Sequence, residues 1–254
     1  LYDGLIADVT IVRANFSRYV IDANRPPDGA VLYPGQNGTE LVPTRTFDGA
    51  PIWHSPPTPN EIADRLTTYH GAYHNALMAE ITRVKEIHGI AILYDCHSIR
   101  SEIPFLFDNR LPDLNIGTFN GTTCARELTD AVTSVCSDNP HFSFVVNGRF
   151  KGGWTTRHYG RPHEGVHAIQ MELAQRTYLA AEIPPFEYSE SRAAPLRTLL
   201  RDILAGLRYV RSSRMVMLLL FMGLATSMLA MPFRFLMPVF VVDVYDRGPE
   251  SMGL

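Results

Sequence analysis

The sequence contains few cysteines and no cluster of basic residues, and each shortage excludes a class of protein. Its three cysteines, Cys96, Cys124 and Cys136, are odd in number and lack the spacing of a zinc-binding motif. We therefore expect reduced thiols in a cytoplasmic protein rather than a disulfide framework. The net charge is -3, and no run of Lys and Arg offers a surface for phosphates. Nucleic acid is thus excluded as an expected partner.

The sequence also lacks an initiating methionine, a signal peptide, internal repeats and low-complexity segments. Its length of 254 residues is compatible with one large domain or two small ones. Because the sequence begins at Leu1, we expect a chain that is truncated at its N-terminus.

Charged residues are absent from residues 215–233, which are almost entirely apolar. A transmembrane helix needs about 20 such residues. Arg208, Arg211 and Arg214 precede this run, as expected of a cytoplasmic flank. A buried core helix is the alternative, but a uniformly apolar run of this length favours a membrane span.

The first half of the sequence predicts loops, then a helix, then a strand. Turn signals such as Pro26-Pro27-Asp28-Gly29 indicate short strands and loops over residues 1–57. A capping box formed by Thr58 and Glu61 begins a helix whose apolar residues recur every three or four positions until Gly89. The apolar run 90–94 follows as a strand, and a helix–strand unit of this kind indicates an α/β fold.

The second half of the sequence predicts further elements of the same fold class. They are a loop over 108–121, a helix over 124–137, strands over 142–146 and 166–171, and a helix over 195–211.

Polar clusters lie at the ends of the predicted strands or in adjoining loops. They are Asn24–Arg25, Asp95–Arg100, Asn147–Arg157 and Gln170–Glu172. This shared location is typical of active sites in open α/β sheets. His97 suits a zinc ion, with Asp95 as its outer partner, and Glu172 suits the general base of metal-assisted hydrolysis. A hydrogen-bonded strand-end histidine and a surface acid are the alternatives.

The clusters also contain more arginine than a neutral substrate requires. Forked guanidinium donors match carboxylates, so Arg25, Arg100, Arg149 and Arg157 indicate a small anionic substrate. Arg25 precedes two prolines, and ordering of its own loop is an equally good interpretation.

Residues 1 to about 193 resemble the N-formylglutamate amidohydrolases. The resemblance rests on motifs in the family's order: YVIDANRP at 19–26, DCHSIRS at 95–101, LPDLNIG at 111–117, NGRFKGG at 147–153 and GVHAIQMEL at 165–173. It implies release of formate from N-formyl-L-glutamate, the last step of one histidine-degradation route.

The resemblance also implies a fold and a set of site residues. The family is similar to zinc carboxypeptidases, which implies a mixed central sheet flanked by helices. By that analogy Asn24 and Arg25 clamp a carboxylate, His97 binds Zn²⁺ and Glu172 is the general base. Zinc would lower the pKa of its bound water to about 7. The other substrate-binding residues that we expect are Arg100, Asn147, Arg149 and Arg157.

The sequence departs from the family at its start. Family members begin with a strand, a Pro-His-Ser-Gly-like turn and a Thr-Asp segment that would supply two more zinc ligands. These motifs are absent here, and His97 alone cannot hold a catalytic zinc tightly. We therefore expect weak or no hydrolase activity from the chain as given, testable by zinc content and formate release.

The C-terminal part resembles a different family. Residues 204–211, the apolar run and residues 237–245 look like the middle of a major facilitator superfamily exporter. This predicts an amidohydrolase-like domain over 1–195, followed over 196–254 by an amphipathic helix and a hydrophobic, membrane-spanning helix. A non-catalytic, membrane-tethered carboxylate-binding or decayed protein and a fragment of an exporter are the alternatives. Desuccinylase-like or aspartoacylase-like activity shares the chemistry of the first interpretation.

Overall fold

The computed structural model describes residues 1–35 and 38–212. The chain divides into two compact units, Leu1–Arg208 and Tyr209–Leu254, and the fold and the site lie in the first. The domain boundary expected at residues 195–196 stays a prediction.

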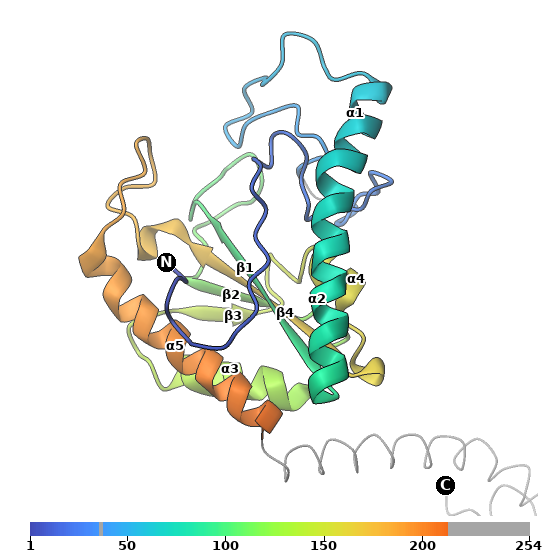
Figure 1. Ribbon diagram of the computed structural model, residues 1–254. Coiled ribbons are helices and arrows are strands. Elements are labelled where there is room, and N and C mark those ends of the chain that lie inside the picture. The colour runs from blue at the N-terminus through green and yellow to red at the C-terminus, as the bar shows by residue number, and fades with distance from the viewer. Residues whose placement is uncertain (36–37, 213–254) are drawn as a thin grey trace, which may run out of the picture. The chain divides into compact units, whose positions relative to one another are not determined.

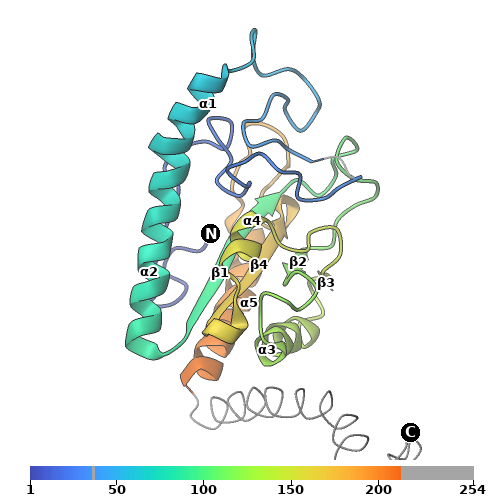
Figure 2. The ribbon, with the colours of Figure 1, turned by 90° about the vertical axis from the view of Figure 1, so that its right-hand side faces the viewer.

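One long helical segment precedes the sheet. It consists of α1 (Pro59–Arg65), the π-helix η1 (Leu66–Gly71) and α2 (Ala72–His88), which Figure 2 shows as one continuous rod. The predicted capping box is confirmed, because the Thr58 N–H donates to Glu61 Oε2 at 2.7 Å and the Glu61 N–H donates to Thr58 Oγ1 at 3.3 Å. Gly89 ends α2 with a φ of 75°, a left-handed conformation that favours glycine. The π-helix was not predicted.

Within the described residues, the sheet has four strands and is mixed, as expected for the α/β class. The strands are β1 (Ala91–Ile99), β2 (Leu114–Gly117), β3 (Phe144–Val146) and β4 (Val166–Ala174), in the spatial order β1-β4-β2-β3. β1 is parallel to β4, whereas β2 is antiparallel to β4 and parallel to β3. In the β1–β4 register, Asp95 lies beside Gln170 and His97 beside Glu172.

The strands differ from the sequence-based expectation in length and number. β1 and β4 continue past the ends predicted for them, because they pair with each other as far as Ile99 and Ala174. Asp95, His97 and Glu172 therefore lie on strands rather than after them. β2 falls in the predicted loop over 108–121, since a strand of four residues is too short to show a period.

The expectation of short strands within residues 1–57 is wrong for the part of that segment that the structure describes. It contains only an isolated bridge between Arg45 and Pro51. Its backbone is held instead by turns and by side chains from elsewhere, such as Arg65, whose Nη1 donates to the Val20 carbonyl at 3.0 Å. Loops of this kind carry no hydrophobic period from which their path could be predicted.

The remaining helices surround the sheet. They are α3 (Arg126–Ser137), α4 (Trp154–Tyr159), α5 (Glu190–Ser212) and the short 3₁₀ turns η2 (Pro162–Glu164) and η3 (Gln175–Thr177). In Figure 1 the sheet lies between α2 at the right and α5 at the left. Helix α4 was not predicted, whereas α3 and α5 confirm the helices expected near 124–137 and 195–211.

The sheet face that packs against α2 and α4 changes from apolar to polar along β1 and β4. At its beginning Ala91 and Val166 are buried against Leu77, Ile81 and Tyr159. Side chains alternate between the two faces of a strand, so Asp95 and His97 share this face with Ala91, as Gln170 and Glu172 do with Val166. The same face is thus apolar over the first half of β1 and β4 and polar over the second half.

The predicted membrane span over 215–233 lies outside the described residues, as do the exporter-like residues 237–245. Within 1–35 and 38–212, no helix has the length and apolar character needed to cross a membrane.

Candidate active site

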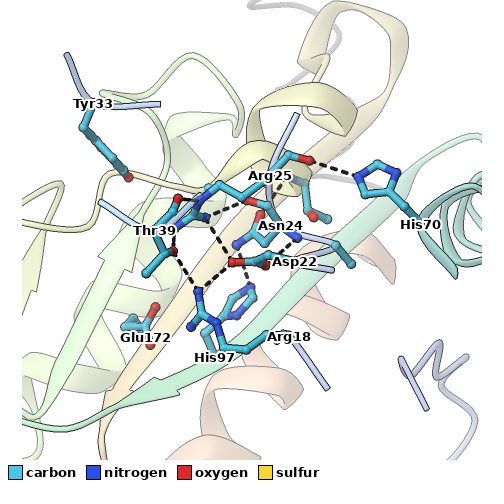
Figure 3. Close-up of polar contacts among 12 residues, drawn as sticks. Arg18, Asp22, Asn24, Arg25, Tyr33, Thr39, His70, His97 and Glu172 are labelled. Atoms are coloured by element: carbon cyan, nitrogen blue, oxygen red, sulfur yellow. Dashed lines mark hydrogen bonds and ion pairs between the residues drawn. The ribbon is translucent and has the colours of Figure 1, made fainter. Parts of the chain in front are cut away.

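A cleft opens at the polar half of the sheet. Asn24 and Arg25 line it from the loop before α1, whereas His97 and Glu172 line it from β1 and β4. Figure 3 shows the loop residues lying over His97 and Glu172. The structure therefore brings together the residues that the sequence predicts as clamp, metal ligand and base.

Glu172 is a buried acid of this cleft, with 7% of its surface exposed. Its Oε2 accepts a hydrogen bond of 3.2 Å from Gln170 Nε2, and Gln170 Oε1 in turn accepts from the Gly153 N–H at 2.7 Å. Burial raises the pKa of Glu172 to about 7, although His97 and Arg18 act in the opposite direction. A carboxyl group with a pKa near neutrality can both accept and return a proton, as a general base requires.

His97 is oriented by a carboxylate on its own strand. Its Nε2 lies 2.7 Å from Asp95 Oδ1 and 3.2 Å from Asn24 Nδ2. The second oxygen of Asp95 accepts a hydrogen bond of 3.0 Å from Thr156 Oγ1 on α4. Burial lowers the pKa of His97, but the Asp95 carboxylate outweighs this effect and raises it to about 9. The Asp95 carboxylate therefore favours the protonated form of the imidazole.

A network of charged side chains holds the loop that carries Asn24 and Arg25. Arg18 donates to Asp22 Oδ2 at 2.6 Å and to Thr39 Oγ1 at 3.0 Å, and Arg25 Nε donates to the Thr39 carbonyl at 2.7 Å. Burial acts to raise the pKa of Asp22, but Arg18 and Arg25 outweigh it and lower that pKa. Arg18, Asp22 and Thr39 line the cleft and were not predicted as site residues. Asp22 falls within the motif at 19–26, which was the available signal.

Asn24 is fixed by the residues that begin α4. Its Oδ1 accepts from the Thr155 N–H at 2.9 Å, and its own N–H donates to Asp22 Oδ1 at 3.0 Å. A Cβ at Gly153 would overlap the side-chain amide of Asn24, so this close approach requires glycine.

Arg149 brings a further guanidinium into the cleft. Its Nη2 donates to the Leu106 carbonyl at 3.1 Å, and the group lies over the ring of Tyr33. Arg18, Arg25 and Arg149 thus place three cations around a pocket whose floor carries Glu172.

Comparison with known proteins assigns the family. The model of the family described as N-formylglutamate amidohydrolase matches residues 1–179. The chain belongs to this family. A protein named N-formylglutamate deformylase from Pseudomonas putida is 45% identical over 200 residues, which cover 78% of this chain and 74% of the relative. A second, from Pseudomonas aeruginosa, is 44% identical over 196 residues, covering 76% and 73%.

A solved structure supports the same assignment. The crystal structure of N-formylglutamate amidohydrolase from Ralstonia eutropha JMP134 has a TM-score of 0.64 and 27% identity, covering 76% of this chain and 74% of that one. The predicted resemblance to the N-formylglutamate amidohydrolases is therefore confirmed. The resemblance of the C-terminal part to an exporter is not supported by these matches.

Three residues expected to bind substrate are not among those that line the cleft: Arg100, Asn147 and Arg157. Arg100 pairs with Asp48 at 2.7 Å. Arg157 donates to the Gly152 and Leu32 carbonyls and lies over Phe119.

Asn147 stabilises the loop at residues 118–120. Its Oδ1 accepts hydrogen bonds of 2.9 Å from the Thr118 N–H and 3.2 Å from the Asn120 N–H. Its φ of 52° is left-handed, a conformation that Asn adopts more readily than most residues. Arg100, Asn147 and Arg157 thus stabilise loops around the cleft, and their contact with substrate stays a prediction.

The donors around His97 do not make a complete metal site by themselves. Within the described residues, no group of three or more His, Cys, Asp or Glu side chains is placed to hold a metal ion. A catalytic zinc normally takes three protein ligands, and His97 is the single one that this part of the chain was expected to supply.

Proposed function

We propose that this chain hydrolyses N-formyl-L-glutamate to formate and L-glutamate. Support comes from membership of the N-formylglutamate amidohydrolase family and from two relatives, 45% and 44% identical, that are named N-formylglutamate deformylase. The observation that carries the proposal is the cleft itself, in which a buried base faces three guanidinium groups.

The charges of the cleft suit a substrate with two carboxylates. Arg18, Arg25 and Arg149 contribute three positive charges, of which Asp22 neutralises one through its ion pair with Arg18. N-formylglutamate carries two carboxylates and a neutral formamide. Guanidinium groups form strong, charge-assisted hydrogen bonds with carboxylates, so three guanidinium groups around the cleft suit a substrate with two carboxylates.

Glu172 supplies the acid–base chemistry. Its carboxylate accepts a proton from the water that attacks the formyl carbon, and the C–O bond forms. Glu172 then returns the proton to the nitrogen of glutamate as the C–N bond breaks, which leaves formate and the free amine. A pKa of about 7 suits both transfers at neutral pH.

We also propose that His97 contributes one ligand to a Zn²⁺ ion, in a fold related to that of zinc carboxypeptidases. Such an ion would polarise the formyl carbonyl. The described residues do not complete its ligand set, so no step above depends on it. The weak activity expected from an incomplete ligand set stays a prediction. Equilibrium dialysis against Zn²⁺ tests the proposal: His97→Ala should weaken zinc binding, whereas exposed His88→Ala should not. Equal zinc binding by both variants would contradict it.

A substrate panel tests the proposed function. Formate release should be fastest with N-formyl-L-glutamate, and kcat/KM should fall about 10- to 100-fold with N-formyl-L-glutamine, which lacks one carboxylate. N-acetyl-L-aspartate and N-succinyl-L-glutamate distinguish the related activities. Calorimetric binding of L-glutamate tests recognition separately from turnover. Preference for a monocarboxylate, or faster hydrolysis of the acetyl or succinyl compound, would contradict the proposal.

A further inference from the structure

Two buried histidines contact the loop that carries the carboxylate clamp. His70 lies in η1 and His74 at the start of α2, with 4% and 8% of their surfaces exposed. The centroids of their rings are 4.4 Å apart, so both face the same side of the helical rod. Neither was singled out by sequence analysis, because a histidine on an amphipathic helix gives no pattern of its own.

The two histidines contact the backbone carbonyls of the two residues that flank Asn24. His74 Nε2 lies 2.8 Å from the Ala23 carbonyl oxygen, and His70 Nε2 lies 3.0 Å from that of Arg25. Figure 3 shows the ring of His70 directed at the Arg25 carbonyl. A carbonyl oxygen only accepts, so both Nε2 atoms carry the proton that is donated.

The other ring nitrogen of His74 contacts Tyr159, whose hydroxyl also donates to the His74 carbonyl at 3.2 Å. His74 Nδ1 lies 3.0 Å from this hydroxyl, and the nitrogen can only accept because Nε2 is the protonated one. Tyr159 belongs to α4, the helix whose Thr155 N–H binds the side chain of Asn24. The backbone of the loop is thus held from η1 and α2, and its Asn24 side chain from α4.

The π-helix accounts for the position of His70. A π-helical segment adds a residue to the turn and rotates the positions that precede it, which is why such segments recur at functional sites. His70 and Trp154 also lie 5.3 Å apart between centroids, and His74 and Trp154 4.5 Å apart. Both imidazole rings are buried, which limits the access of water to the two carbonyl contacts.

We propose that His70 and His74 are positioning residues that hold Asn24 and Arg25 in the orientation that binds the substrate carboxylate. The role of the clamp rests on the proposed function, whereas the anchoring of the loop does not. Neither histidine is among the residues that line the described cleft, so their effect on catalysis is transmitted through the loop.

Matched substitutions separate anchoring from packing. His70→Phe and His74→Phe keep a ring but remove the N–H donor, whereas His70→Gln and His74→Gln restore an N–H donor. His158→Phe is the control, since His158 is exposed and stacks on the same Trp154 with centroids 4.4 Å apart. We expect the Phe variants to raise KM for N-formyl-L-glutamate about 10-fold, with kcat changed less than about 3-fold. The Gln variants and the control should stay within about 3-fold of the wild type in both parameters.

Amide hydrogen exchange tests the anchoring without any substrate. The Asn24 and Arg25 N–H groups bind Asp22 within the anchored loop. Their exchange should accelerate about 10-fold or more in the Phe variants and not in the Gln variants. Unchanged exchange in folded Phe variants, or equal acceleration in the Gln variants, would overturn the proposal. Accelerated exchange in a chain that neither binds L-glutamate nor releases formate would keep the anchoring and refute the proposed function.

Discussion

The two sides of the cleft are built in different ways. On the sheet side, His97 and Glu172 lie on paired strands whose backbone hydrogen bonds fix their register. On the loop side, Asn24 and Arg25 belong to a segment whose described part has no regular strand or helix, and long-range side-chain contacts hold it in place. Under the proposed function, the sheet side carries out proton transfer and the loop side recognises the carboxylate.

This division has a consequence for how each side responds to mutation. A side chain on a paired strand can be replaced without moving its neighbours, because the backbone ladder remains. A loop held by a few polar contacts loses its geometry when one contact is removed. Substitutions on the sheet side should therefore change kcat, and substitutions on the loop side should change KM.

The largest effect is expected from Glu172→Gln on the sheet side. The amide keeps the shape of the carboxylate but cannot accept the proton, so kcat for formate release should fall about 10²- to 10⁴-fold. Exposed Glu86→Gln on α2 is the matched control and should behave as the wild type. A kcat for Glu172→Gln within a factor of three of the wild type would show that Glu172 is not the general base.

A smaller effect is expected from Arg25→Gln on the loop side. Loss of a charge-assisted hydrogen bond to a carboxylate should raise KM about 10- to 100-fold. Arg100→Gln should change KM much less, because Arg100 pairs with Asp48 and is not among the residues that line the cleft. Steady-state kinetics on both variants would check this. A larger KM change for Arg100→Gln would indicate that Arg100, rather than Arg25, binds the substrate carboxylate.

Gly153→Ala should disturb the contact between the two sides. The added Cβ would overlap the amide of Asn24, and overpacking of this kind costs about 1–3 kcal/mol. Gly206→Ala is the control: nothing lies within 4 Å of its Cβ position in α5, so the free energy of unfolding should rise by about 0.5–1 kcal/mol. Urea denaturation measures both, and equal stability of the two variants would argue against the tight approach at Gly153.

The smallest effect is a pH dependence of stability that arises at His74. Burial lowers its pKa from 6.5 to about 4; His70 and His158 act in the same direction, whereas the Ala23 carbonyl and Asp95 oppose it. Between these two values the unfolded chain binds more protons, so stability falls as the pH falls from about 7 to 4. His74 should account for a loss on the order of 1–2 kcal/mol between pH 7 and pH 5.

Urea denaturation at pH 7 and pH 5 measures this contribution. The wild type should lose more stability between the two pH values than His74→Phe, whose ring does not titrate. An identical loss in both proteins would show that His74 does not contribute.

The sequence was a better guide to the sheet side than to the loop side. The apolar run 90–94 and the run 166–171, which Glu172 follows, predict strands, because hydrophobic runs of this length report burial. The family resemblance singled out Asn24 and Arg25. Arg18 and Thr39, which hold these residues, stayed hidden because their contacts join loop positions that no period relates.

The arginines that were expected to bind substrate show the same limit of prediction from sequence. Arg25 and Arg149 line the cleft and also donate to loop carbonyls, whereas Arg100 and Arg157 support neighbouring loops without lining it. A guanidinium group is equally suited to a substrate carboxylate and to a backbone carbonyl. The sequence therefore predicts how many such groups lie near the site but not which of them turn toward it.

The most direct test of the division between chemistry and recognition is calorimetric binding of N-formyl-L-glutamate to Glu172→Gln and to Arg25→Gln. Glu172→Gln, which hydrolyses too slowly to consume the ligand, should bind it within about 3-fold of the affinity of the wild type for L-glutamate. Arg25→Gln should bind it at least about 10-fold more weakly. Loss of binding in Glu172→Gln together with full binding in Arg25→Gln would contradict the account.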